Sequence, residues 1–124
     1  MNTASHTKTP FASTLPGCFY YDPAIYSQEQ EHIFSKMWVY ACRADTLPEP
    51  GSYQVVALAV EYIIIVRDKN SRLQAFLNVC RHRGASLGNQ QSGHLKGSIQ
   101  CHCHAWTYGL DGQLIGAPNL LRST

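Results

Sequence analysis

Two short segments of the chain place cysteine and histidine close together. Residues 80–82 read Cys-Arg-His, and residues 101–104 read Cys-His-Cys-His. Each segment offers a thiolate and an imidazole, so two loop tips that meet would supply two sulfur and two nitrogen ligands. This symmetric donor set fits two metal ions better than one. The four candidate ligands are Cys80, His82, Cys101 and His104.

Other interpretations of these residues stay open at this point. The same four side chains could hold one tetrahedral Zn²⁺ and make the chain a zinc-stabilised interaction module, although the zinc-finger spacings C-x-x-C and H-x-x-x-H are absent. His102 and Cys103 could compete as ligands, which would change the geometry of the second loop. A free cysteine is also often simply a buried apolar residue.

The composition fits one small domain in a reducing compartment. A chain of 124 residues, 44% of them hydrophobic, has room for one core. The net charge of +2 gives no argument for a nucleic acid or membrane partner, and the longest apolar stretch, residues 55–66, is too short to span a bilayer. The N-terminus lacks the pattern of a secretory signal. Five cysteines are an odd number, and three of them lie late in the chain beside histidines, which favours metal binding in the cytoplasm over a disulfide framework.

The elements that would carry the two segments are mainly short strands. An Asp-Pro pair at residues 22–23 has the form of a helix N-cap and first helical position, and predicts a short helix over residues 23–36. Downstream, runs of β-branched and aromatic residues between polar turns predict antiparallel strands. The expected strands span residues 38–42, 53–57, 62–67, 72–78, 98–101, 106–108 and 113–115. The predicted fold class is therefore mostly β, a small antiparallel sandwich or barrel with one N-terminal helix.

A long polar stretch and two unpatterned ends complete the chain. Residues 81–97 are rich in Gly, Ser, Asn and Gln, which indicates a long loop of the kind that usually has a function. We expect residues 1–18 to form a loosely ordered arm and residues 19–118 to form the domain. Residues 119–124 contain two leucines without a stop signal and resemble the truncated start of a following segment.

The spacing of the two motifs resembles a known signature. C-x-H, a spacer of 18 residues, and C-x-x-H followed by tryptophan are similar to the Rieske iron-sulfur signature. Residues 80–87 and 104–112 also resemble the N-terminal domain of the large (alpha) subunit of aromatic-ring-hydroxylating oxygenases. The similarity extends upstream through residues 19–23, the predicted helix and residues 47–53, and so covers residues 18–118.

The resemblance implies a cofactor and assigns its ligands. In the family, one [2Fe-2S] cluster is bound by two loops; carried over, Cys80 and Cys101 hold one iron while His82 and His104 hold the other. Imidazole ligands raise the reduction potential to about −150 to +300 mV, well above that of plant-type ferredoxins, which suits one-electron transfer toward an oxygen-activating iron. Residues expected beside the cluster are Arg81, Arg83, Gly84 and Trp106.

The second loop departs from the commonest family pattern. Pro-Tyr between the cysteine and the histidine is replaced by His102-Cys103, and the following glycine is replaced by Ala105. The sequence His-Ala-Trp also occurs in the family, notably among members acting on quaternary ammonium compounds. The remaining histidines have no partners at ligand spacing and are expected to be ordinary polar residues; they are His6, His32 and His94.

One motif of the family's oxygenases is absent from the chain. Ring hydroxylation needs a mononuclear non-haem iron held by two histidines and a carboxylate, and the family's D/E-x-x-H-x-x-x-x-H pattern does not occur here. We therefore expect the electron-entry domain of a Rieske mono- or dioxygenase, which hydroxylates nothing alone. The implied partners are a reductase or ferredoxin donor and a catalytic iron domain, commonly within a homotrimer. A free-standing Rieske ferredoxin-type electron carrier is the alternative, although small Rieske ferredoxins generally lack the leading helix.

Overall fold

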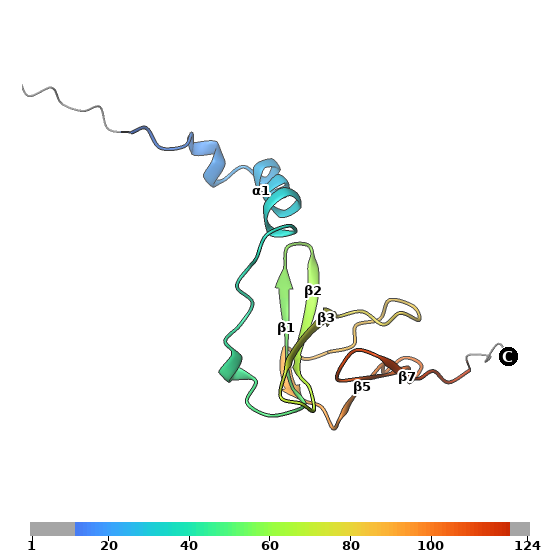
Figure 1. Cartoon of the computed structure of the whole chain (residues 1–124). Helices are drawn as coiled ribbons and strands as arrows, with labels where there is room; N and C mark the ends of the chain where they lie inside the picture. Colours follow the sequence, from blue (N-terminus) through green and yellow to red (C-terminus); the bar gives the residue numbers. More distant parts are fainter. Residues whose placement is uncertain (1–11, 120–124) are drawn as a thin grey trace, which may run out of the picture.

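The computed structural model of the chain describes residues 12–119 (Figure 1). Its elements confirm the prediction of a mostly β, antiparallel domain with a short N-terminal helix. None of the helices in this part is long and apolar enough to cross a membrane. The predictions for the two chain ends lie largely outside the described residues. The elements are η1 (Gly17–Tyr20), α1 (Pro23–Glu29), η2 (Gln30–Phe34), η3 (Ala44–Thr46), β1 (Ser52–Leu58), β2 (Glu61–Arg67), β3 (Leu73–Leu77), β4 (Ser92–His94), β5 (Ser98–Gln100), β6 (Thr107–Gly109) and β7 (Leu114–Gly116).

Two antiparallel sheets form the body of the domain. The larger sheet has the strand order β3-β2-β1-β4, and the smaller sheet has the order β5-β6-β7. β1 and β2 form a hairpin in which Leu58 pairs with Glu61. An Asp-Gly turn at residues 111–112 joins β6 to β7, and Gly112 adopts a φ of +85° that favours glycine.

The hydrophobic core contains residues of both sheets and both cysteines of the candidate site. Tyr53 and Ile64 contribute from the larger sheet, and Ile99 and Tyr108 contribute from the smaller one. Burying a large apolar side chain stabilises a fold by about 1.5–3 kcal/mol. The core cluster also includes Val66, Leu110, Cys80 and Cys101. The packing of the sheets therefore fixes the base of each candidate ligand loop.

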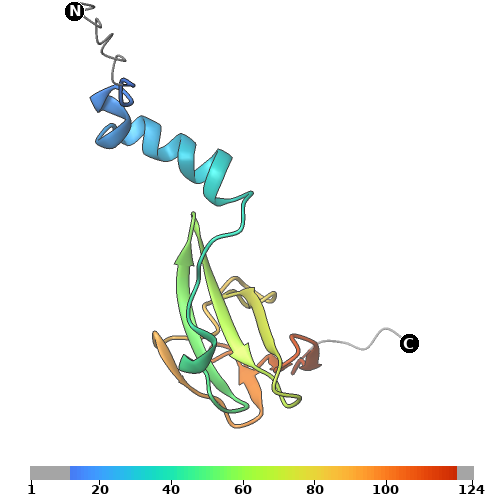
Figure 2. The same ribbon diagram turned by 60° about the vertical axis from the view of Figure 1, so that its left-hand side comes forward.

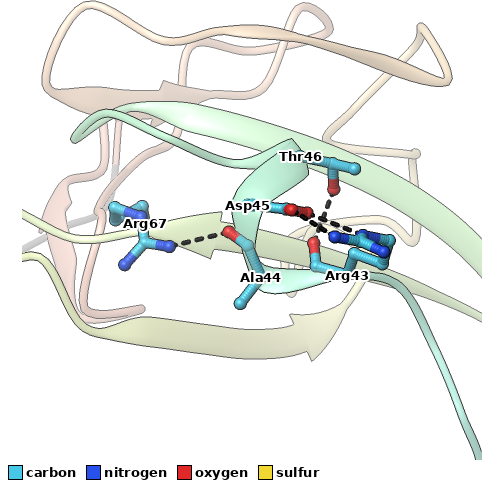
Figure 3. Close-up of polar contacts among 5 residues, drawn as sticks. All are labelled: Arg43, Ala44, Asp45, Thr46 and Arg67. Carbon is cyan, nitrogen blue, oxygen red and sulfur yellow. Dashed lines mark hydrogen bonds and ion pairs between the residues drawn. The ribbon is translucent and has the colours of Figure 1, made fainter.

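Arg67 fastens the segment before β1 to the larger sheet. Its Nη2 donates to the carbonyl of Ala44 at 2.9 Å, and its Nε donates to the carbonyl of Leu47. Figure 3 shows the bond to Ala44 beside the local ion pair of Arg43 and Asp45, whose N–O distance is 2.6 Å. Leu47 is fully buried. Arg67 therefore fixes residues 44–47 to the larger sheet, ahead of strand β1.

The N-terminal helix stands away from the sheets in both ribbon views (Figures 1 and 2). Asp22 Oδ1 accepts the N–H of Ala24 at 2.9 Å, which confirms the predicted N-cap. The single helix predicted over residues 23–36 is instead α1 followed by the π-helical turn η2. No residue of η1, α1 or η2 is buried. The exposed large apolar side chains of these three elements are Phe19, Tyr20, Tyr26, Ile33 and Phe34.

The strand predicted over residues 38–42 is wrong. This segment has no regular structure, and Trp38 and Tyr40 are 105% and 75% exposed. β-propensity mainly reflects how a side chain packs on a half-buried sheet. No strand in residues 12–119 pairs with the segment, so its β-forming residues have no sheet to pack on.

A strand that the sequence did not predict lies inside the long polar stretch. β4 pairs antiparallel with β1, with Ser52 opposite His94. Gly93 in this strand lies against the ring of Tyr53, where an added Cβ would come within 2.9 Å of a ring carbon. A Ser-Gly-His sequence carries no strand periodicity, so the unpaired edge of β1 determines this element, not local propensity.

Candidate metal centre

The first candidate ligand loop is a tight turn that begins at Cys80. The N–H of Cys80 donates to the carbonyl of Ala85 at 2.7 Å, and the N–H of Gly84 donates back to the carbonyl of Cys80 at 2.9 Å. Gly84 has a φ of +77°, a left-handed conformation that glycine adopts without steric cost. These bonds close the loop and leave the residues between them at its tip.

The second loop has the same backbone frame. The N–H of Cys101 donates to the carbonyl of Trp106 at 2.8 Å, and the N–H of Ala105 donates to the carbonyl of Cys101 at 3.0 Å. Ala105 has a φ of +56° and so occupies the position of Gly84 in the first loop. The two loops are therefore equivalent from the cysteine to the fifth residue after it, and this is the symmetric pair that the motif spacing predicted.

Asn78 fixes the backbone that follows the first loop through three hydrogen bonds. Its buried Oδ1 accepts the N–H groups of Leu87 and Gly88 at 3.1 Å and 2.7 Å, and its Nδ2 donates to the carbonyl of Gly88 at 3.1 Å. A buried amide in this position satisfies backbone groups that no strand pairs. Asn78 was not predicted from the sequence, because it stands at the end of an expected strand without a motif around it.

The loops bring the four predicted ligands together with sulfur inside and nitrogen outside. Cys80 and Cys101 are 1% and 3% exposed, whereas His82 and His104 are exposed. The two imidazole rings meet edge to face with their centroids 4.6 Å apart. All five cysteines of the chain are free thiols. The arrangement thus separates a buried thiol side from an accessible imidazole side.

Tyr108 lies beside the buried thiols. Its hydroxyl is 3.3 Å from Cys80 Sγ and accepts the N–H of Arg81 at 3.0 Å. Burial raises the pKa of the Cys80 thiol, but hydrogen bonds from Tyr108, from the backbone of His82 and from Cys101 outweigh it and hold that pKa below its ordinary value. Burial, and then the bond to Cys80, raise the pKa of Tyr108. The tyrosine therefore remains a protonated donor to the thiolate form of Cys80.

The two residues that could compete as ligands lie at the exposed tip of the second loop. Cys103 Sγ is 3.4 Å from Nε2 of His102, whose Nδ1 is 3.2 Å from Nδ2 of Asn89. Desolvation, and then the charge of Cys101, raise the pKa of the Cys103 thiol. In the second loop it is Cys101, and not Cys103, that is buried with Cys80 in the core cluster.

The residues expected beside the cluster lie in the two loops. Arg81 and Arg83 are exposed at the tip of the first loop. Trp106 stacks on the ring of His82 with centroids 4.9 Å apart and planes 18° apart. His32 and His94 are exposed, and His6 lies outside the described residues. The hydrogen bonds of Tyr108 were not predicted from the sequence, although a buried tyrosine hydroxyl usually has a hydrogen-bond partner.

The comparisons with known proteins agree with this geometry. A family model of the Rieske [2Fe-2S] domain matches residues 37–123. The chain belongs to the Rieske [2Fe-2S] domain family. This Rieske domain is 42% identical over 108 residues to the carnitine monooxygenase oxygenase subunit of Acinetobacter baumannii, which covers 87% of the chain and 29% of that protein. It is 35% identical over 97 residues to the large oxygenase component of the naphthalene 1,2-dioxygenase system of Pseudomonas aeruginosa, covering 78% of the chain and 21% of that protein.

Solved structures give the same fold. The Rieske domain superposes on naphthalene 1,2-dioxygenase from Rhodococcus sp. bound to indole with a TM-score of 0.80 at 33% identity, covering 86% of this chain and 24% of that one. The chain therefore spans less than a third of the length of each of these relatives.

The residues present fit the cofactor of the family, a Rieske-type [2Fe-2S] cluster. Two thiols and two imidazoles converge from equivalent loops, and the thiols are buried, where a sulfide-bridged iron pair is shielded from water. In residues 12–119 no three His, Cys, Asp or Glu side chains are grouped as ligands of one metal ion. A cluster that divides its four ligands between two irons does not need such a group. Family membership thus assigns the cluster in place of the zinc alternative.

Proposed function

We propose that this Rieske domain transfers single electrons as the entry domain of a Rieske non-haem iron oxygenase. Cys80 and Cys101 hold one iron of the [2Fe-2S] cluster, and His82 and His104 hold the other. The observation that carries the proposal is the convergence of two equivalent loops with their thiols buried and their imidazoles exposed. When bound, the cluster takes up one electron and releases it to an acceptor.

The donor set explains why such a site is suited to an oxygenase. Two thiolates bring the charge of two ferric ions and two sulfides to zero, whereas four thiolates would leave a net negative charge and disfavour reduction. Tyr108 donates a hydrogen bond toward the sulfur of Cys80 and further offsets its negative charge. The buried thiol side excludes water, and the exposed edges of His82 and His104 give a partner its shortest approach.

Residues 15–40 favour the role of an oxygenase domain over that of a free-standing carrier. These residues expose many large apolar side chains, including Tyr26, Ile33, Met37 and Trp38. Exposed apolar side chains gathered in one segment mark a site of contact with another part of a protein more often than a free surface. The relatives are more than three times as long as the part of them that is matched here, which leaves room for a catalytic iron domain.

The partners of the domain follow from this role. An electron donor, a flavin reductase or a ferredoxin, docks at the imidazole side, and a catalytic non-haem iron accepts the electron. As in the family architecture, the full protein forms a trimer in which an acidic residue of the neighbouring chain bonds to a cluster histidine. We place the protein in the cytoplasm, where its cysteines stay reduced.

The experiment combines reduction with a search for product. The purified chain, loaded with cluster, is mixed with a flavin reductase or ferredoxin and reductant, and its visible absorbance is followed. We expect the absorbance to bleach and recover on reoxidation, with no hydroxylated product from any aromatic or quaternary ammonium substrate. The Cys101→Ala variant, which lacks one proposed ligand, is the control that should show no bleaching.

Two results would contradict the proposal. Hydroxylated product from this chain alone, with ferrous iron supplied and peroxide removed, would require an oxygen-activating site within the 124 residues. Failure of the loaded chain to accept electrons from any donor would exclude electron entry. The carrier alternative is separated by reading the neighbouring coding sequence for the D/E-x-x-H-x-x-x-x-H motif.

A further inference from the structure

We propose that Trp106 is the positioning residue of His82: it reaches from the second loop to the first and fixes the plane of that imidazole for iron binding. The inference rests on the proposed ligand role of His82. In this inference an indole ring supports His82 and no such ring supports His104, although the two loops have equivalent backbone hydrogen bonds.

The stack of Trp106 on His82 crosses between the two loops. The ring centroids are 4.9 Å apart and the planes are 18° from parallel. His82 is otherwise exposed, and its neighbours in the loop, Arg81, Arg83 and Gly84, are exposed as well. No hydrogen bond to the ring of His82 is present in residues 12–119, so the flat indole face and the edge contact with His104 are what restrict its rotation.

Trp106 is itself held firmly. Its carbonyl accepts the N–H of Cys101 at 2.8 Å, and it packs against the core cluster. The preceding carbonyl, that of Ala105, accepts the hydroxyl of Thr107 at 2.9 Å, and Thr107 begins β6. The backbone of Trp106 is thus fixed at the end of the loop and its side chain packs on the core, whereas the imidazole it touches is on an exposed tip.

The equivalent position in the first loop explains the asymmetry. Ala85 is the fifth residue after Cys80, as Trp106 is the fifth after Cys101, and its carbonyl makes the same bond to the cysteine N–H. Alanine has no ring to stack on an imidazole. In the described structure the rings of His82 and His104 lie edge to face, with planes 86° apart. The indole of Trp106 therefore orients one of the two ligand rings, that of His82.

The test compares Trp106→Phe and Trp106→Leu with Trp38→Leu, which removes the other, fully exposed tryptophan. Aromatic stacking favours a bound geometry by a factor of about 2 to 12, so we expect Trp106→Leu to shorten the half-life of the visible cluster absorbance by about that factor. Trp106→Phe, which keeps a flat ring, should restore part of the loss. Trp38→Leu should match the unsubstituted protein.

A spectroscopic signature separates positioning from packing. In the reduced protein, pulsed electron paramagnetic resonance resolves the nitrogen couplings of the histidine ligands. We expect one of the two histidine couplings to change or broaden in Trp106→Leu, the other to keep its value, and Trp106→Phe to lie between. Thermal unfolding of the cluster-free proteins reports the loss of core packing independently.

The outcomes distinguish this inference from the proposed function. If the unsubstituted protein has no histidine couplings, the proposed ligands fail. If it has two and both are unchanged in Trp106→Leu, or both change together with a loss of core stability, the positioning role of Trp106 is overturned. If Trp106→Leu does not fold, the same comparison is made with Trp106→Phe, where unchanged couplings and half-life overturn the inference.

Discussion

Replacing Tyr108 by phenylalanine should lower the reduction potential of the cluster. The hydroxyl lies 3.3 Å from Cys80 Sγ and is the side-chain donor nearest to that thiol. Reduction adds negative charge that is shared by the thiolate ligands. A hydrogen-bond donor at the sulfur therefore stabilises the reduced form more than the oxidised form, and its removal makes reduction harder.

The size of the shift follows from the strength of this bond. A hydrogen bond to a charged acceptor contributes about 1.5–3 kcal/mol, and it is made in both oxidation states. If about a third of it, roughly 0.5–1 kcal/mol, distinguishes the two states, the potential falls by about 20–45 mV, because 59 mV corresponds to a tenfold change for one electron.

Protein-film voltammetry measures the shift directly. Tyr53→Phe is the matched control, since Tyr53 is buried in the same core cluster and its hydroxyl makes no hydrogen bond in the described structure. We expect that control to keep its potential. An unchanged potential in Tyr108→Phe, or an equal shift in both variants, would refute the reasoning that the Tyr108 hydroxyl acts on the Cys80 sulfur.

Five further substitutions test the loops and the turn that precedes β3. Ala105→Gly should raise stability to denaturant by about 0.5–1 kcal/mol, because alanine is strained at a φ of +56°; Gly84→Ala should cost a similar amount although its added Cβ meets nothing within 4 Å, and equal stabilities would contradict the shared frame. Asp68→Asn should lose stability at neutral pH: hydrogen bonds from Gln74 and the backbone hold the pKa of Asp68 below its ordinary 3.8, so its contribution is present above that pH and is lost as the pH falls through the lowered value, and unfolding curves of the variant should show a weaker acid dependence. Cys101→Ala should abolish cluster retention whereas Cys103→Ser should keep it, as read from iron content, and loss in Cys103→Ser alone would show that the wrong cysteine was chosen.

The sequence indicated the two cysteine-histidine segments and most of the strands, because these depend on local chemistry. Cysteine and histidine at C-x-H and C-x-x-H spacing are typical of metal binding, and an Asp-Gly pair has a strong preference for turns. The segment over residues 38–42 was mispredicted and β4 was missed for one reason. Strand formation depends on an available sheet edge. Within residues 12–119 the edge of β1 pairs with the Ser-Gly-His segment of β4, whereas no strand pairs with the segment around Trp38.

The supporting residues of the site were harder to predict than its ligands. Tyr108 and Asn78 act through hydrogen bonds that form only when the sheets and loops are packed. The partner of Tyr108 lies far from it in the sequence, and the partner of Asn78 lies across a loop whose path the sequence does not give. The pairing of Trp106 with His82 joins opposite loops and has no sequence spacing to signal it. Such contacts depend on the three-dimensional arrangement of the loops, which the motif alone does not contain.

The most direct test of the account is the iron and acid-labile sulfide content of the chain purified without oxygen damage. We predict a reddish-brown protein with about two irons and two sulfides per chain, held by two cysteines and two histidines. A colourless protein with one zinc and no sulfide would contradict the central claim.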